Sequence, residues 1–415
     1  MHYSKGLKAF FFWFLLLTFG TVFLLGCAGK SAFQKGQEEY YKADFEKSIE
    51  YFEKTKTKKD KNYVLYMLDL GTAYFTIGDY YEAQNAYLAG VQTMEKDVSE
   101  LETAVQLAKS DRKKTYTGDP HDMVMAHIYL GLLSMELGDI EAAEIEFKKA
   151  LESDRGKEEK YEGDVCLAHY FLGQIYKEKG ELDNAKVAFR NVTEYNPDFP
   201  YAWYELADIV REEHLFEESE KLFQNYLEKD KYRSLGQSLE HDDNLGDLTV
   251  VLCLGKGPMK KADPFLGAFS RVTPTKYKEK RAEISLSEGI LGTTYQIDDV
   301  TFQAKTSGGF GGQLARKTAQ VVTQEALKQV PGVGLFSGLL LGGSGADVRY
   351  WYTLPGEFQI FRGFIAPGNY NLELKFYDEK DKELKGYRQV WYYISVRKGQ
   401  PSILILRSML GLQKT

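Results

Sequence analysis

At 415 residues, the chain is long enough to form two domains with sizeable hydrophobic cores. Hydrophobic residues make up 43% of it and charged residues 27%, which is ordinary for a globular protein. The formal net charge of −7 argues against general nucleic-acid binding, because that function requires a basic face.

The N-terminal segment predicts export of the chain rather than a folded element. Lys5 and Lys8 supply positive charge, residues 9–25 form an almost unbroken apolar run, and Gly26-Cys27 closes it. This order resembles a bacterial lipoprotein signal, in which a peptidase cuts directly before the cysteine. An uncleaved membrane anchor and a plain secretory signal are the alternatives.

The lipoprotein resemblance implies that residues 1–26 are a signal peptide and that Cys27 carries acyl chains such as palmitate. Several acyl chains make a firm anchor, at about 0.8 kcal/mol for each buried methylene group. Ala28 follows the cysteine, in place of the Asp that retains many lipoproteins at the inner membrane. The resemblance therefore implies the outer membrane, with the protein facing the periplasm.

A helical pattern then repeats along the chain. Leu172-Gly173, Ala185 and Phe189 recur 34 residues later as Leu206-Ala207, Ser219 and Phe223. A period of 34 is that of the tetratricopeptide repeat (TPR), a helix pair that buries its apolar side only by stacking on further copies. Related patterns around Gly71 and Gly131, with a degenerate first copy, predict about five helical pairs in an all-α solenoid over residues 27–230.

The second repeat shows the physical basis of the pattern. Gly71 and Ala83 are small, so that two helices can approach closely, and Gly78 permits the turn between them. Tyr74 and Tyr87 are expected to fill the space between layers.

An insertion separates the second repeat from the third. Residues 91–122 predict an extended helix to about Lys109, followed by a polar loop. The segment is either a protruding partner contact or only a longer second helix with a solvated loop.

The first helix of each TPR pair lines the concave side of the solenoid. In the last two repeats the predicted partner-binding groove consists of Tyr170, Gln174, Lys177, Tyr201, Tyr204, Asp208 and Arg211. Stacked tyrosines beside cationic tips suit an extended peptide or its carboxylate. In repeats two and three the corresponding positions are mostly apolar, which suits a partner helix. Coverage of this surface by the chain's own first or last helix is the open alternative.

The pattern changes after the solenoid. Residues 231–246 are polar and predict a linker, and residues 247–415 predict a β-rich domain with turn signals between its strands. The expected strands are Leu248–Leu254, Arg281–Leu286, Tyr295–Ala304, Glu357–Phe364, Tyr370–Phe376, Tyr387–Val396 and Ser402–Leu406. The predicted fold class is therefore α+β, a TPR solenoid followed by a sandwich-like antiparallel sheet domain.

One helix is expected to interrupt the β-rich domain. Residues 313–330 place apolar side chains on one helical face, and the apolar, glycine-rich segment 331–343 follows. The two segments form either a hairpin that touches a membrane or a core helix covering the sheet with a buried loop.

The element Asp347-x-Arg349-x-Trp351-x-x-Leu354-Pro355 resembles an uncharacterised family of TPR-containing bacterial lipoproteins with a C-terminal β-rich domain. The resemblance implies an envelope-associated lipoprotein and supplies no activity. Asp347 and Arg349 lie on one side of an extended segment. They either bind a ligand or form a structural ion pair beside a packed Trp351.

No residue set predicts a reaction. The chain lacks a His-Glu-x-x-His motif, a Gly-x-Ser-x-Gly elbow and a phosphate loop. His127 and His169 occupy equivalent repeat positions and are expected in the core or at its boundary. Cys166 and Cys253 are expected to be two separate buried thiols, although an oxidising periplasm would also permit a disulfide. We therefore predict no catalytic residue, no metal site and no cofactor.

The leading hypothesis is a non-enzymatic outer-membrane lipoprotein scaffold, whose TPR groove binds a protein or peptide partner of a cell-envelope assembly. The alternative is a glycan- or peptidoglycan-binding envelope module that uses the aromatic residues of the β-rich domain. These aromatic residues are Trp351, Tyr352, Trp391, Tyr392 and Tyr393.

Overall fold

A computed structural model describes residues 30–96, 115–156, 158–232, 244–265, 269–287, 289–307, 346–385, 391–399 and 401–408. The predicted signal peptide and Cys27 lie outside the described residues, as do the predicted helix 313–330 and the segment 331–343.

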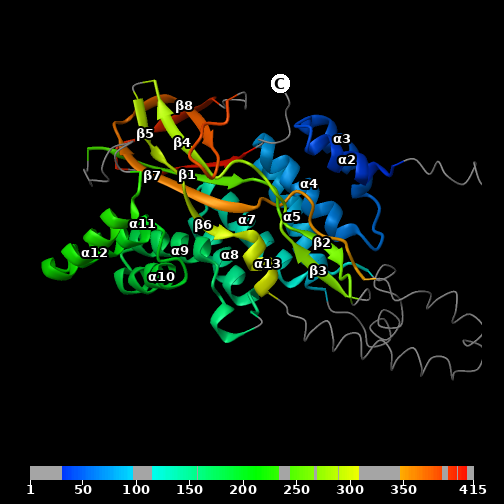
Figure 1. Cartoon of the computed structure of the whole chain (residues 1–415), viewed down its shortest axis with the longest axis horizontal. Helices are drawn as coiled ribbons and strands as arrows, with labels where there is room; N and C mark the ends of the chain where they lie inside the picture. The colour runs from blue at the N-terminus through cyan, green and yellow to red at the C-terminus, as the bar shows by residue number, and fades with distance from the viewer. Residues whose placement is uncertain are drawn as a thin grey trace, which may run out of the picture.

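Stacked helix pairs build the N-terminal solenoid (Figure 1). The pairs are α2 (Ala32–Tyr40) with α3 (Phe45–Lys56), α4 (Tyr63–Ile77) with α5 (Tyr80–Met94), α7 (Pro120–Glu136) with α8 (Ile140–Ser153), α9 (Cys166–Glu178) with α10 (Leu182–Tyr195), and α11 (Pro200–Glu212) with α12 (Phe216–Lys229). They coincide with the helical pairs that the repeat pattern predicts.

The repeat glycines act as their position predicts. A Cβ atom on Gly71 would lie 2.7 Å from the Tyr87 ring, and one on Gly173 would lie 2.6 Å from the Phe189 ring. Gly78 ends α4 with a φ of +82°, a left-handed conformation that favours glycine. Close helix approach and the turn between helices therefore follow from local sequence.

The predicted continuous helix to about Lys109 is wrong at its start, because α5 ends at Met94. After residues 97–114, which lie outside the described residues, Tyr116 donates its backbone N–H to the Lys61 carbonyl (2.7 Å). The described chain thus resumes beside the beginning of α4, and the rest of the predicted helix lies outside the described residues.

Two four-stranded sheets and a β-hairpin make up the described part of the β-rich domain. The first sheet has the order β10-β1-β7-β6, from β1 (Gly246–Leu254), β6 (Tyr295–Asp299), β7 (Glu357–Ile365) and β10 (Pro401–Arg407). The second has the order β5-β4-β8-β9, from β4 (Arg281–Leu286), β5 (Gly289–Thr293), β8 (Gly368–Tyr377) and β9 (Trp391–Val396). The hairpin joins β2 (Met259–Ala262) to β3 (Ser270–Thr273).

The first sheet is mixed, whereas the sequence predicted an antiparallel one. β1 and β10 pair in parallel, with Val250 opposite Leu404. The strand before β10 belongs to the second sheet, so β10 reaches β1 by crossing between sheets and not by a hairpin. Parallel pairs are usually buried on both faces, and that is the situation of this sheet.

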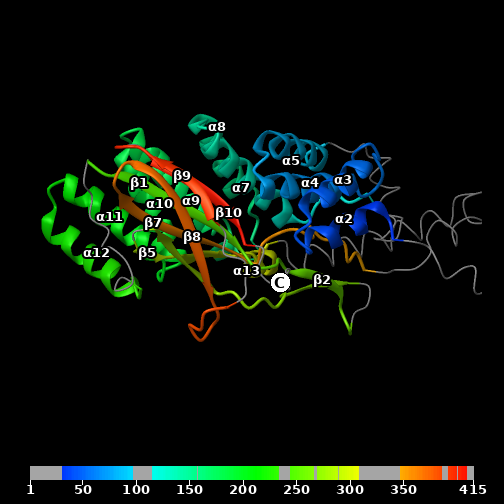
Figure 2. The same ribbon diagram turned by 90° about the horizontal axis from the view of Figure 1, so that it is seen from above.

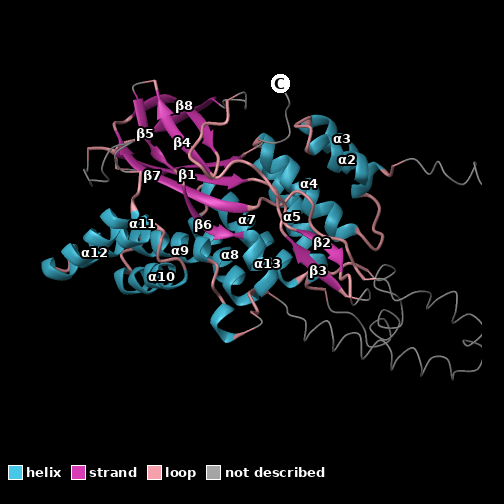
Figure 3. Ribbon diagram, in the orientation of Figure 1, coloured by secondary structure: helices cyan, strands magenta, loops and turns pink. Residues whose placement is uncertain are grey.

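The first sheet is the middle of three layers, between the solenoid and the second sheet (Figure 3). In the view from above, its strands lie over α9 and α10 (Figure 2). Leu248, Val250 and Leu252 of β1 pack toward the second sheet, while Val251 and Cys253 pack against the helices. This alternation follows from the two-residue period of a strand. The sheet therefore joins the solenoid and the second sheet into one continuous structure.

One predicted strand is partly wrong. The predicted strand Tyr295–Ala304 ends at Asp299, where helix α13 (Val300–Thr306) begins. The Asp299 carboxylate accepts hydrogen bonds from the backbone N–H groups of Thr301 (2.7 Å) and Phe302 (3.1 Å). Aspartate is a strong helix N-cap, and this local effect outweighs the alternating pattern. The short strands β2, β3 and β5 were not predicted.

Candidate functional site

The concave face of the solenoid is covered from within the chain. The first β-sheet and the segment 346–355, which precedes β7, pack against the first helices of the repeats. The sequence analysis considered coverage by the first or last helix. The structure shows instead that the β-rich domain is the occupant.

Trp351 fills the groove beside the second and third repeats. Its ring centroid lies 5.7 Å from that of Tyr87 and 5.6 Å from that of Tyr129. Its indole Nε1 donates to the hydroxyls of Thr72 (3.0 Å) and Thr353 (3.1 Å). The large apolar surface of the indole is thus buried, and its one polar atom is satisfied.

Asp69 of α4 binds the backbone of the same segment. Its carboxylate accepts from the Thr353 backbone N–H (3.0 Å), the Thr353 hydroxyl (2.9 Å) and Gln37 Nε2 (3.0 Å). Burial raises the pKa of Asp69 to about 7, although these hydrogen bonds oppose the rise. The solenoid thus holds an extended segment through its backbone, a mode that peptide-binding domains also use.

Arg349 fixes the beginning of this segment. It forms an ion pair with Asp347 (2.6 Å) and donates to the Lys61 carbonyl (3.2 Å) and to Asn62 Oδ1 (2.9 Å). The structural ion pair predicted beside a packed Trp351 is therefore confirmed, and Arg349 also links the segment to the solenoid.

A charged network closes the other end of the groove. Arg362 of β7 forms an ion pair with Glu205 of α11, and both side chains are buried. Lys177 donates to Glu205 (2.9 Å) and to Asp208 (2.7 Å). Burial alone would raise the pKa of Asp208, but Lys177 and Arg211 hold it below its usual value.

The β-rich domain also caps a solenoid helix. Asp298 of β6 accepts hydrogen bonds from the backbone N–H groups of Cys166 (3.1 Å) and Leu167 (2.7 Å) at the start of α9. The first N–H groups of a helix have no partner inside the helix, so this contact satisfies donors that would otherwise be buried unpaired. No local motif in α9 could reveal it.

Three of the predicted groove residues are inside the interface. Tyr170, Tyr201 and Tyr204 are buried, and the ring centroid of Tyr201 lies 5.7 Å from that of Tyr295 in β6. The Tyr204 ring faces Phe364 of β7. In this arrangement the β-rich domain occupies the place that the prediction gave to a partner.

The other predicted groove residues are more polar and less enclosed. Asp208 is buried within the charged network, Gln174 donates to Glu205 (2.9 Å), and Lys177 is partly exposed. The Arg211 side chain is 57% exposed. Partner binding by the predicted set stays a prediction, and of its members Gln174, Lys177 and Arg211 lie where solvent reaches.

The aromatic residues of the glycan hypothesis do not share one surface. Trp351 and Tyr352 lie at the solenoid, where the Tyr352 ring centroid is 4.9 Å from that of Tyr41. Tyr393 is exposed on β9 of the second sheet. The side chains of Trp391 and Tyr392 lie outside the described residues. The prediction of a glycan-binding surface that includes Trp351 is therefore wrong.

Two histidines of the solenoid and the thiols of Cys166 and Cys253 are buried, as the sequence predicts. His127 and His169 are buried, with ring nitrogens 2.6 Å from Glu146 Oε2 and 2.8 Å from the Gly163 carbonyl respectively. Cys166 and Cys253 are free and buried, as predicted. In the described residues, no group of three His, Cys, Asp or Glu side chains could hold a metal ion. No helix in the same ranges is both long and apolar enough to cross a membrane.

The acidic anchors of the groove, Asp69 and Glu205, were not predicted from the sequence. Asp69 and Glu205 each stand two residues before the small residue of their repeat, Gly71 and Ala207. The equivalent residue of the third repeat is Tyr129. A carboxylate at a position that is otherwise aromatic was the available signal that another part of the chain must supply its partner.

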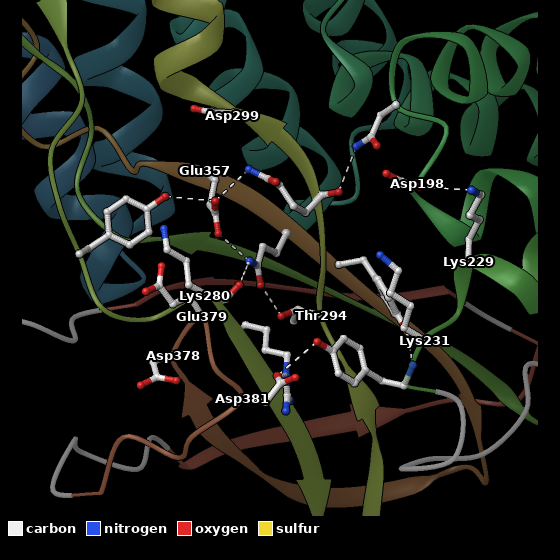
Figure 4. A pocket seen from close by; sticks show the side chains of 17 residues that line it. Asp198, Lys229, Lys231, Lys280, Thr294, Asp299, Glu357, Asp378, Glu379 and Asp381 are labelled. Carbon is white, nitrogen blue, oxygen red and sulfur yellow. Dashed lines mark hydrogen bonds and ion pairs between the residues drawn. The ribbon is translucent and has the colours of Figure 1, made fainter.

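A second cavity lies where the end of the solenoid meets the β-rich domain (Figure 4). Its volume is about 630 Å³. The solenoid end contributes Asn196, Asp198, Lys229, Lys231 and Tyr232. The β-rich domain contributes Tyr277, Lys280, Arg281, Thr294, Tyr295, Gln296, Asp299, Glu357, Gln359, Asp378, Glu379 and Asp381. We call this cavity the junction pocket.

Glu357 lies at the centre of a hydrogen-bond network in the junction pocket. It accepts from the Tyr277 hydroxyl (3.1 Å), Gln296 Nε2 (2.8 Å) and Gln359 Nε2 (2.7 Å). Gln359 in turn accepts from the Thr294 hydroxyl. Burial raises the pKa of Glu357 to about 7.

The comparisons with known proteins identify the repeats. A tetratricopeptide repeat model matches residues 126–157 and 168–199, which cover α7–α8 and α9–α10. The chain thus contains TPR repeats. A search of the curated proteins finds no match.

Several solved structures are similar to about half of this chain. The crystal structure of MamA is 22% identical and covers 47% of this chain and 94% of its own, with a TM-score of 0.35. MamA 41-end from Desulfovibrio magneticus RS-1 is 12% identical and covers 49% of this chain and 98% of its own, with a TM-score of 0.37. YrrB, described as a TPR protein with an unusual peptide-binding site, is 14% identical and covers 48% of this chain and 84% of its own, with a TM-score of 0.35. Similarity at this level gives no basis for transferring a function.

Replacement of Trp351 by Ala should strongly destabilise the protein. The side chain is 1% exposed, and truncation of a buried tryptophan typically lowers the free energy of unfolding by about 3–5 kcal/mol. Urea denaturation followed by circular dichroism would measure this loss. The control is Tyr393→Ala, because Tyr393 is 72% exposed and its replacement should change the free energy by no more than about 0.5 kcal/mol. Equal effects of the two substitutions would contradict the described packing of Trp351.

Glu357 should make stability depend on pH. Its pKa of about 7 in the folded chain lies above its ordinary value of 4.5, so the folded chain holds a proton that the unfolded chain releases between these values. The free energy of unfolding should therefore fall as the pH rises from about 5 to 8. Glu357→Gln should reduce this fall by about 1–3 kcal/mol. The matched change Glu379→Gln, at an exposed site, should leave this fall unchanged. An unaltered pH dependence of the free energy of unfolding in Glu357→Gln would contradict the burial argument.

Proposed function

We propose that this protein is a non-enzymatic, lipid-anchored interaction scaffold of the bacterial outer membrane that faces the periplasm and holds a protein or peptide of an envelope assembly. The observation that supports the proposal most is the TPR solenoid, an architecture that offers extended binding surfaces without a reaction centre. The lipoprotein-like signal that ends at Cys27 supports the anchor.

The filled groove directs the proposal toward a different surface of the solenoid. Lys177 and Arg211 remain accessible to solvent beside the groove. Leu215 ends the turn between α11 and α12, and Phe216 begins α12. Leu215 is 50% exposed and Phe216 is 64% exposed. We call these four residues the open edge. It combines adjacent apolar side chains with Lys177 and Arg211, which are both paired with Asp208, so that it suits mainly the apolar residues of a protein partner.

The β-rich domain has a structural part in this proposal. It fills the groove, caps α9 through Asp298 and neutralises Glu205 through Arg362. The solenoid is therefore held in one shape, so that the open edge is presented without the cost of ordering it on binding.

Replacement of Cys27 by Ala should remove the anchor. Several acyl chains hold a protein at a membrane much more firmly than one chain does, and the substitution removes their attachment atom. In cells, the wild-type protein should label with radioactive palmitate and sediment with outer membranes. The variant should do neither. Cys253→Ala is the matched control because it removes a buried thiol and should keep both properties. Labelling that survives in Cys27→Ala would exclude lipidation at this residue.

A photoreactive amino acid at Phe216 should crosslink to one specific protein in intact cells. Position 216 lies on the open edge, whereas position 201 lies inside the covered groove. The matched exposed control is Phe265, which is 93% exposed and lies between β2 and β3. We expect a discrete adduct from position 216 that positions 201 and 265 do not give, identified by mass spectrometry.

The pattern of adducts separates the possible binding surfaces. An adduct from position 201 and none from position 216 would show that the β-rich domain leaves the groove to admit the partner, and the open edge would be the wrong surface. Equal adducts from positions 216 and 265 would mean that exposure alone determines crosslinking. The absence of any adduct at 216 would contradict partner binding at this edge.

A further inference from the structure

The junction pocket has the dimensions of a ligand site. Its volume of about 630 Å³ falls within the roughly 300–1,000 Å³ of small-molecule sites, which often lie between domains. It lies between the solenoid end and both sheets, so that neither domain alone forms it. Of the lining side chains, Tyr295 also packs against Tyr201 of the covered groove.

The lining of the junction pocket excludes an apolar ligand. No aliphatic side chain is among the described residues that line it, and its only aromatic side chains are tyrosines. Amides, carboxylates and hydroxyl groups make up most of the wall. A molecule that fits must therefore donate and accept hydrogen bonds over most of its surface.

The deep wall of the pocket is held in one arrangement. Thr294, Glu357 and Gln359 are buried, and they hydrogen-bond in sequence from the Thr294 hydroxyl through the Gln359 amide to the Glu357 carboxylate. The Gln359 side chain also donates to the Lys280 carbonyl (2.7 Å). A ligand therefore meets donors and acceptors that are already oriented.

The described lining of the pocket has four cations and six carboxylates, and pairing of Lys229 and Arg281 with carboxylates leaves two lysines that can receive an anionic group. Asp198 lies 3.3 Å from Lys229, and Asp381 lies 2.8 Å from Arg281. Lys280 lies over the Tyr277 ring, 4.0 Å from its centroid. Within the described ranges, neither Lys231 nor Lys280 has a carboxylate partner at ion-pair distance. They line the pocket from its solenoid side and its β-domain side respectively.

We propose that the junction pocket binds an acidic saccharide, with Lys231 and Lys280 receiving its carboxylate and the fixed amide and carboxylate groups of the wall receiving its hydroxyls. Hydroxyls both donate and accept, which matches a wall of mixed amides and carboxylates. Charge-assisted hydrogen bonds to the lysines distinguish an acidic from a neutral sugar. The junction pocket is separate from Trp351 and Tyr352. The proposal of a saccharide site does not depend on partner binding at the open edge.

The test compares two probes that differ by one acidic group. The disaccharide of N-acetylglucosamine and N-acetylmuramic acid carries a lactyl carboxylate, which N,N′-diacetylchitobiose lacks. Isothermal titration calorimetry with the full-length mature protein in detergent should show at least about tenfold tighter binding of the acidic probe, as expected from one charge-assisted hydrogen bond. This preference should decrease as the salt concentration rises. Digalacturonate, a second acidic probe, shows whether the N-acetyl groups are also required.

Substitutions assign the binding to the pocket. Lys231→Met and Lys280→Met should each weaken binding of the acidic probe at least about tenfold. Lys280→Arg should retain more of the affinity, because it keeps the charge. Lys221→Met, an exposed site on α12, is the matched control and should bind like the wild type. Unchanged melting temperatures, followed by circular dichroism, establish that the variants are folded.

Several outcomes would overturn the proposal. Equal affinity for the acidic and neutral disaccharides, or no binding of any saccharide, would exclude an acidic-sugar site. Binding of the dipeptide alanyl-glutamate without saccharide binding would assign the pocket to peptides instead. Binding that survives both lysine substitutions would place the saccharide elsewhere on the protein.

Discussion

The structure depends on two buried carboxylates at opposite ends of the solenoid groove. Asp69 binds the Thr353 backbone and hydroxyl, and Glu205 forms an ion pair with Arg362 of β7. A buried carboxylate with too few partners is costly. The β-rich domain adds partners to those that the solenoid supplies, which are Gln37 for Asp69 and Gln174 and Lys177 for Glu205. The β-rich domain satisfies both carboxylates only in one position along the groove. We infer that these contacts mainly determine the position in which the two parts dock. Their net contribution to stability is small, because the cost of removing the charges from water offsets much of the attraction energy of an ion pair.

Apolar side chains fill the interface between the two carboxylates. Val251 and Cys253 of β1 and Trp351 pack against the solenoid, and the other face of β1 packs against the second sheet. Separation of the solenoid from the β-rich domain would therefore expose an apolar face on each of them. The TPR groove of this protein is therefore an interface between two parts of the chain. Its tyrosines resemble a ligand site in the sequence because tyrosine suits both domain packing and ligand binding.

Local physics made much of the fold predictable, and non-local contacts account for the rest. The helix pairs follow from a 34-residue period and small residues such as Gly71 and Gly173, and most strands follow from alternation. The parallel pairing of β1 with β10 and the cap that Asp298 gives to α9 join segments that are distant in sequence. No local sequence pattern predicts this strand pairing or this helix cap. The predicted groove residues lie on the first helices of the last two repeats, α9 and α11, but the covering domain buries Tyr170 and Tyr204.

The position of the predicted anchor gives the two proposed surfaces a common orientation. Helix α2 begins at Ala32, so only a few residues separate it from Cys27, and a fully extended chain spans at most about 3.6 Å per residue. An acylated Cys27 would thus hold the first repeat within roughly 20 Å of the membrane surface. The helix α12 lies at the opposite end of the solenoid from α2 (Figure 1). The open edge and the junction pocket adjoin that far end, where a partner or a saccharide could approach without competing with the lipid surface.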